Sequence, residues 1–225
     1  MKTELSLGTS RSVGTEVRIP CGSVKLAGEV TMPPGAPGLV LFAHGSGSSR
    51  NSPRNQFVAE ILRRNGTATL LFDLLTPEEE ASSGRRLVFN IPLLAQRLID
   101  ATRWLARRAE TRHLGIGYFG ASTGAAAALI AAAELGATVD AVVARGGRPD
   151  LAGEALPRVN APTLFIVGGK DEPVLTWNRQ AYERLTCAKE LHVIAGATHL
   201  FEEPGALEEV ARLASHWFRH HLRPR

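Results

Sequence analysis

The amino-acid sequence predicts an α/β fold in which a mostly parallel sheet of about eight strands carries helices on both faces. Strand and helix patterns alternate from Leu39 to the end of the chain, which is typical of βαβ crossovers. Several strand segments are continuously apolar, as expected for strands that are buried on both faces. These observations together favour one parallel sheet over a sandwich or a helical bundle.

The first elements are two short strands that no helix separates, so we expect an antiparallel hairpin at one edge of the sheet. They cover residues 16–20 and 24–33 and meet at the turn Cys21–Ser23. The apolar run 39–44 then predicts the first strand that is buried on both faces.

Helical periodicity begins after this strand. In residues 53–66, Phe57, Ile61 and Leu62 fall on one face, and Gly66 ends the helix. The later elements alternate in the same way, with strands over 67–75, 114–119, 139–147, 161–169 and 190–196 and helices over 91–110, 122–135, 173–185 and 204–222.

The chain is expected to form a flexible N-terminal tail over residues 1–14 and a single domain over residues 15–225. No large lid domain is expected, because the segment 144–163 is too short for a helical cap. The site should therefore be open and shallow. The segment 74–90 is longer than an ordinary βα loop and is a candidate for a partial cover, although its acidic run is more simply a solvated face.

Composition excludes several classes of function. The chain has 225 residues, 44% of them hydrophobic, and a formal net charge of +4 that comes mostly from scattered arginines. No basic block interleaves with aromatic residues, so we expect no nucleic-acid binding. No signal peptide and no membrane-spanning run are recognised, so we expect no membrane association. Cys21 and Cys187 lack C-x-x-C spacing, which favours reduced thiols in a cytoplasmic protein.

The stretch Gly-Ala-Ser-Thr-Gly, residues 120–124, stands where an apolar strand passes into an alanine-rich helix. A G-x-S-x-G sequence in this context predicts a nucleophile elbow, in which Ser122 occupies a strained turn with its hydroxyl exposed. Gly120 and Gly124 then lack side chains because the turn is crowded. The alternative is a tight strand-to-helix turn with Ser122 as the helix N-cap.

Two further loops follow strands at the same predicted edge of the sheet. Asp171 lies in Gly-Gly-Lys-Asp after the strand 161–169, and His199 lies in Gly-Ala-Thr-His after the last strand. Each alone is more simply a structural residue. The chain order serine, acid, histidine is that of the α/β-hydrolase triad, with His199 as base and Asp171 orienting the imidazole.

The loop His-Gly-Ser-Gly, residues 44–47, follows the strand 39–44. Acyl transfer needs hydrogen-bond donors for the developing oxyanion, and we expect the backbone N–H groups of Ser46 and Thr123 to supply this oxyanion hole. His44 is interpreted as shaping the loop by hydrogen bonding. A phosphate-binding loop is disfavoured because no P-loop pattern is present.

The chain resembles the dienelactone-hydrolase-like group of α/β hydrolases, some of whose relatives are fused to a phosphoribosyltransferase. The resemblance rests on HGSGSS, GYFGASTGAAAAL, VVARGGRPDL, LFIVGGKDEPV and GATHLFEEPGAL. It implies no metal and no organic cofactor. Dienelactone hydrolase itself uses a cysteine nucleophile, whereas Ser122 stands at this elbow, which favours a serine carboxylesterase.

The leading hypothesis is therefore a serine hydrolase that cleaves small carboxylic esters through an acyl-enzyme. Hydrolysis of a dienelactone or other lactone by the same triad is one alternative, and a non-catalytic binding or accessory module is another. Four arginines, Arg50, Arg54, Arg145 and Arg148, lie in loops near the site edge. They suit an anionic ester, but are more simply surface residues. The expected partner is a small ester or lactone, and a homodimer is compatible with the sequence.

Overall fold

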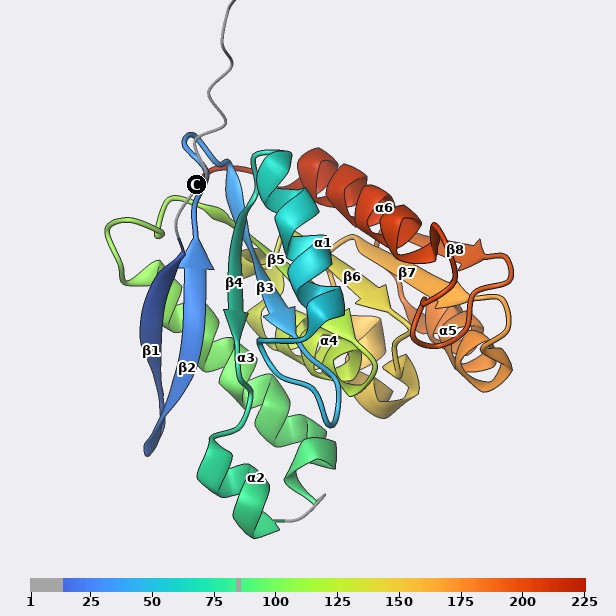
Figure 1. The fold of residues 1–225 in the computed structure, drawn as a ribbon, viewed down its shortest axis with the longest axis horizontal. Coiled ribbons are helices and arrows are strands. Elements are labelled where there is room, and N and C mark those ends of the chain that lie inside the picture. The colour runs from blue at the N-terminus through green and yellow to red at the C-terminus, as the bar shows by residue number, and fades with distance from the viewer. Residues whose placement is uncertain (1–13, 84–85) are drawn as a thin grey trace, which may run out of the picture.

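Eight strands form a single sheet in the order β1-β2-β4-β3-β5-β6-β7-β8 in the computed structural model, which describes residues 14–83 and 86–225 (Figure 1). The predicted flexible tail over residues 1–14 lies, apart from Gly14, outside the described residues. The strands are β1 (Thr15–Cys21), β2 (Val24–Thr31), β3 (Gly38–Ala43), β4 (Ala68–Phe72), β5 (Gly115–Ala121), β6 (Ala141–Arg145), β7 (Thr163–Gly168) and β8 (Lys189–Ile194).

The first two strands form the predicted antiparallel hairpin, with Cys21 opposite Val24, and β2 also pairs antiparallel with β4. The strand pairs from β4 through β3 to β8 are parallel. The carboxyl ends of β3, β5, β6, β7 and β8 therefore meet at one edge, where an open α/β sheet binds its ligands. The predicted fold class is confirmed.

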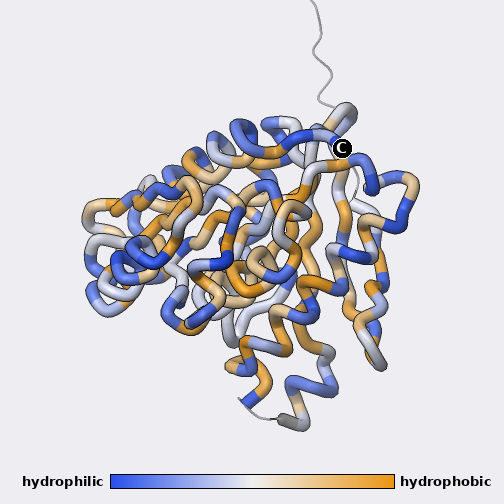
Figure 2. Tube along the Cα trace, turned by 180° about the vertical axis from the view of Figure 1, so that it is seen from behind, coloured by the Kyte–Doolittle hydropathy of each residue, from blue (hydrophilic) through white to orange (hydrophobic). Residues whose placement is uncertain are grey.

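Helices cover both faces of the sheet. In Figure 1, α1 (Pro53–Arg64) and α6 (Ala206–His221) lie in front of the sheet, while α3 (Ile91–Ala106), α4 (Thr123–Leu135) and α5 (Glu172–Arg184) lie behind it. The core is correspondingly divided into two layers, one on each face. Figure 2 shows hydrophobic stretches gathered along the central strands and hydrophilic ones on the outer turns of the helices.

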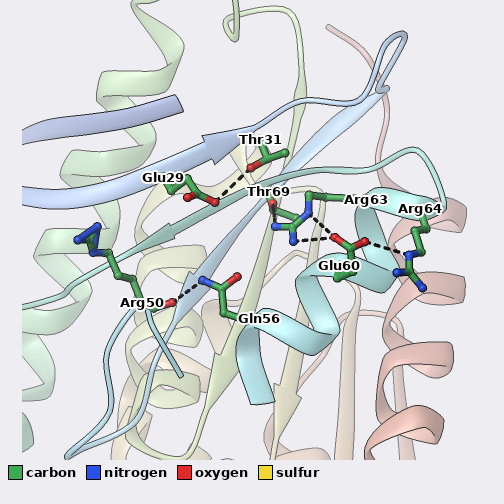
Figure 3. A network of polar contacts seen from close by, with 8 residues as sticks. All are labelled: Glu29, Thr31, Arg50, Gln56, Glu60, Arg63, Arg64 and Thr69. Atoms are coloured by element: carbon green, nitrogen blue, oxygen red, sulfur yellow. Dashed lines mark hydrogen bonds and ion pairs between the residues drawn. The ribbon is translucent and has the colours of Figure 1, made fainter. Parts of the chain in front are cut away.

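The last turn of α1 is fastened to the sheet by a part-buried arginine. The Arg63 guanidinium donates to the Glu60 carboxylate at 2.9 Å and to the Thr69 hydroxyl on β4 at 3.3 Å (Figure 3). Arg64 binds the other Glu60 oxygen at 2.9 Å. These hydrogen bonds lower the pKa of Glu60. The contacts fix the helix whose N-terminus lies at the site edge.

The structure adds helices that the sequence patterns did not predict. The segment 74–90 contains α2 (Pro77–Ser83) and the short 3₁₀ helix η1 (Leu87–Phe89), and Pro149–Arg158 forms the 3₁₀ segment η3 after β6. Glu79 of α2 pairs with Arg97 of α3 at 2.7 Å, so α2 is held beside α3. That the segment 74–90 partly covers the site stays a prediction. Within the described ranges, no helix has the length and apolar character required to cross a bilayer.

Candidate active site

Ser122 occupies the turn between β5 and α4 with φ 51° and ψ −122°. A positive φ is unusual for a residue with a side chain, and in the described part of the chain only Ser122 and Phe201 share it among residues other than glycine. The Ser122 side chain makes no capping hydrogen bond to the helix. A strained backbone and a half-buried side chain that does not cap the helix are what a nucleophile elbow requires.

The two glycines around Ser122 are required by close packing. A Cβ built on Gly120 would lie 2.5 Å from the Ala125 Cα, and one on Gly124 would collide with the Ala43 carbonyl of β3. The Ser122 backbone is fixed from the neighbouring strand as well, because its N–H donates to the Arg145 carbonyl at 3.3 Å. Ser122 does stand at the N-cap position of α4, but its side chain makes no capping hydrogen bond, so the geometry does not support the alternative of a simple capping serine.

The loop after β3 lies directly against the elbow. A Cβ built on Gly45 would be 2.9 Å from the Ser122 Cβ and 3.7 Å from its Oγ. The next residue, Ser46, donates its backbone N–H to the Thr123 hydroxyl at 3.0 Å. Both predicted oxyanion-hole residues are thus brought together beside Ser122, with the Ser46 donor directed toward the elbow.

His44 holds this loop in place through both ring nitrogens. Its Nε2 accepts the Leu74 backbone N–H at 3.0 Å, so Nδ1 carries the proton and donates to the Gly45 carbonyl at 3.0 Å. Burial lowers the pKa of His44, so the ring is neutral at physiological pH. The predicted loop-shaping role of His44 is confirmed by these hydrogen bonds.

Asp171 and His199 are joined on the loops after β7 and β8. The His199 Nδ1 lies 2.6 Å from the Asp171 Oδ2, and Asp171 makes no side-chain capping bond to α5. Gly168 makes this approach possible, because a Cβ there would collide with the Ala197 and Thr198 carbonyls. The Lys170 N–H also donates to the Ala197 carbonyl at 2.9 Å. The two loops are therefore packed against each other at the point where acid and imidazole meet.

The end of β6 lies between the elbow and the histidine loop. The backbone carbonyl of Arg145 accepts the Ser122 N–H. A Cβ built on the next residue, Gly146, would be 3.5 Å from the His199 Cε1. With Nδ1 on Asp171, the His199 Nε2 is the nitrogen left for a proton from substrate or nucleophile. No hydrogen bond joins Ser122 to His199 among the described residues, so that contact stays a prediction.

The histidine loop has supports that sequence reasoning missed. Glu203 accepts the Thr198 N–H at 3.0 Å, and that bond lowers the pKa of the Glu203 carboxyl. Phe201, with φ 57°, is buried between this loop and β6. A glutamate four residues after the histidine is a weak local signal, because only the folded loop shows which N–H it meets.

The four arginines at this edge have different surroundings. Arg50 pairs with Asp73 at 3.2 Å and Arg54 with Glu202 at 3.3 Å. Arg148 pairs with Asp150 at 2.8 Å and lies over the Trp177 ring. Arg145 has no acidic partner among the described residues and is only 6% exposed. Its interpretation as a surface arginine was therefore wrong, because β6 carries it beneath the loop edge.

Neither cysteine competes with Ser122 as nucleophile. Both are free thiols, with Cys21 buried in the core. Burial raises the pKa of Cys21 to about 11 and also raises that of Cys187. Thiols with raised pKa values are poor sources of thiolate. Within the residues that the structure describes, no cluster of three or more histidine, cysteine or carboxylate side chains is placed to hold a metal ion.

The family model for the alpha/beta hydrolase domain matches residues 36–215, a range that contains the elbow, Asp171 and His199. The chain belongs to this alpha/beta hydrolase family. A crystal structure of dienelactone hydrolase from Anabaena variabilis is 59% identical, with a TM-score of 0.92 over 94% of this chain and 99% of that one. The predicted resemblance to the dienelactone-hydrolase-like group is confirmed.

A second relative bears on the expected link to phosphoribosyltransferases. A protein of Mycobacterium tuberculosis that bears the name of a phosphoribosyl transferase is 59% identical over 207 residues, which are 92% of this chain. The chain spans only 46% of that relative's length. Est1E from Butyrivibrio proteoclasticus is 16% identical with a TM-score of 0.78 over 92% of this chain and 98% of that one, and shows the shared fold.

Proposed function

We propose that this hydrolase cleaves small carboxylic esters through an acyl-enzyme formed on Ser122. The observation that carries the proposal is the Asp171–His199 contact of 2.6 Å on loops that flank the same sheet edge as the strained Ser122 turn. An imidazole held through Nδ1 by a carboxylate presents Nε2 as a base, which is what a serine hydroxyl needs to become a nucleophile.

In the first half-reaction, His199 removes the Ser122 proton while Oγ attacks the ester carbonyl carbon. The carbonyl oxygen becomes an anion that the backbone N–H groups of Thr123 and Ser46 stabilise. Thr123 begins α4, so the helix N-terminus adds a favourable dipole. His199 then gives the proton to the departing alcohol, and Asp171 stabilises the transient imidazolium.

In the second half-reaction, water takes the place of the alcohol. His199 accepts a proton from the water as its oxygen attacks the acyl carbon, and then returns a proton to the Ser122 Oγ as the acid leaves. A site that is open and shallow, as the sequence predicts, would suit short acyl chains, because long chains require an apolar tunnel.

The proposal is tested with p-nitrophenyl acetate and a fluorophosphonate probe. We expect Ser122→Ala to lose at least about 10⁴-fold in kcat and to abolish labelling, with an unchanged thermal unfolding midpoint. Ser23→Ala, in the exposed β1–β2 turn, is the matched control and should behave like the wild type. Turnover by Ser122→Ala at the wild-type rate would refute the serine mechanism.

Lactone hydrolysis by the same residues is the second candidate. It is favoured by the 59% identity to a protein whose structure is named dienelactone hydrolase. A panel of acyl esters, thioesters and lactones compared by kcat/KM separates the two. Failure of the folded protein to react with the probe would instead support a binding or accessory module.

The transferase name of the mycobacterial relative does not transfer to this site. That protein is more than twice as long as the matched region. We propose that any transferase activity there resides in the part that this chain does not match. Absence of ester hydrolysis together with phosphoribosyl transfer by this chain would contradict that assignment.

A further inference from the structure

Arg145 is a buried arginine without an acceptor. It ends β6 and is 6% exposed, and its Nε is fully buried with no hydrogen-bond partner. No hydrogen bond or ion pair reaches its guanidinium from any of the described residues. Its neighbour is the Phe201 ring, whose centroid lies 5.6 Å from the Arg145 Cζ.

A charged group in this position is normally paired. A guanidinium carries five N–H donors, and a buried donor without an acceptor, as Nε is here, carries a free-energy penalty. Each of the other three arginines at this edge has its own carboxylate. The side chain that acts electrostatically on Arg145 is another cation, Arg54. Burial and this neighbour lower the pKa of Arg145 to about 10, so it still carries its charge at neutral pH.

The surroundings of Arg145 favour an anion for two further reasons. Arg54 stands in the first turn of α1, a twelve-residue helix with no acidic side chain in that turn, and the N–H groups of such a turn favour negative charge. The partner of Arg54 is Glu202, whose side chain is 66% exposed and is therefore free to be displaced. Arg54 itself is one-third exposed, so this arginine is open to solvent.

We propose that Arg145 and Arg54 form a binding site for a small oxyanion, a carboxylate or phosphate group, on the α1 side of the histidine loop. The planar fork of each guanidinium suits two oxygens of such a group. The Phe201 ring approaches both Arg145 and Gly146, and His199 approaches the same Gly146, so the proposed site and the histidine share this surrounding. A bound anion would therefore fix the loop that carries His199. The site goes beyond the proposed esterase activity and does not depend on it.

The first test uses inorganic phosphate and thermal unfolding. We expect phosphate, compared with potassium chloride at equal ionic strength, to raise the wild-type midpoint by about 5 °C or more near saturation. Arg145→Met should abolish this rise and, in chloride, should be at least as stable as the wild type, because it removes an unpaired buried charge. Arg148→Met, which removes an arginine that already has a carboxylate, is the control and should keep the rise.

A second variant keeps the test decisive if Arg145→Met does not fold. Arg54→Gln changes a part-exposed side chain and should reduce the phosphate-dependent rise by at least half. A rise of the same size in wild type, Arg145→Met and Arg54→Gln would overturn the site.

A kinetic arm identifies where the oxyanion comes from. The ratio of kcat/KM for mono-p-nitrophenyl succinate to that for p-nitrophenyl butyrate is compared between wild type and Arg145→Met. A tenfold fall in this ratio would assign the site to a carboxylate of the substrate. An unchanged ratio with a lost phosphate response would assign it to a free anion. If neither the phosphate response nor the ratio depends on Arg145, the proposal is wrong, whatever the fate of the esterase proposal.

Discussion

The backbone N–H of Ser46 donates to the Thr123 hydroxyl at 3.0 Å, and this hydrogen bond ties the loop after β3 to the first turn of α4. The two residues are 77 positions apart in the chain. The bond directs one expected oxyanion donor toward the residue that supplies the other. Because the Thr123 hydroxyl already accepts the Ser46 N–H, an oxyanion bound there must share this N–H with the hydroxyl or replace the hydroxyl as its acceptor.

Removal of the Thr123 hydroxyl should loosen this arrangement. We expect Thr123→Val to lower kcat for p-nitrophenyl acetate by about tenfold with little change in KM. The Ser46 N–H, which the Thr123 hydroxyl holds in place, stabilises the transition state and not the bound ester. Thr123→Ser keeps the hydroxyl and should retain most of the rate. A faster Thr123→Val enzyme would show instead that the hydroxyl competes with the oxyanion.

Asp171 should matter through the imidazole that it holds. Asp171→Asn keeps the shape but favours the wrong tautomer of His199, so we expect kcat to fall about 10³- to 10⁴-fold. The comparison is Asp150→Asn, which removes a carboxylate that pairs with Arg148 at the same edge. Equal activity of the two variants would exclude Asp171 from the mechanism.

Gly168 tests whether close packing of the two loops sets the distance between acid and base. A Cβ there would come within 2.6 Å of the Thr198 carbonyl oxygen, so Gly168→Ala must push the histidine loop away. We expect a loss of about 1–3 kcal/mol in the free energy of unfolding and a marked fall in kcat. At the neighbouring Gly169 the nearest atom would be 3.3 Å away, so Gly169→Ala should cost less on both measures.

The buried His44 should make stability depend on pH. Its pKa is lowered in the folded protein, so between that value and about 6.5 the unfolded chain binds more protons than the folded one. The free energy of unfolding should therefore decrease as pH falls below about 6.5, by at most about 1.4 kcal/mol per pH unit from this group.

Urea unfolding at pH 5.5, 6.5 and 7.5 measures this slope. His44→Gln has no titrating ring and should show a shallower slope. The slope should not vanish, because burial also lowers the pKa of His221 and acts in the same direction. Identical slopes in variant and wild type would remove His44 as the cause.

Local sequence signals were sufficient for the sheet and for the order of the site residues. Continuous apolar runs such as 114–119 and helical periodicity in 53–66 arise within single elements, so they predict those elements without knowledge of their neighbours. The position of Ser122, Asp171 and His199 directly after strands followed from the same patterns. Parallel pairing then required their loops to share one edge.

What these patterns could not supply are relations between residues far apart in the chain. The bond from Ser46 to Thr123 depends on β3 pairing with β5, and the approach of His199 to Asp171 depends on Gly168 packing against the next loop. Arg145 looks like any loop arginine until β6 is placed beneath Phe201 and beside Arg54. Partners, burial and unpaired charge are properties of the assembled packing, since a side chain's neighbours are set by other elements and not by its own segment.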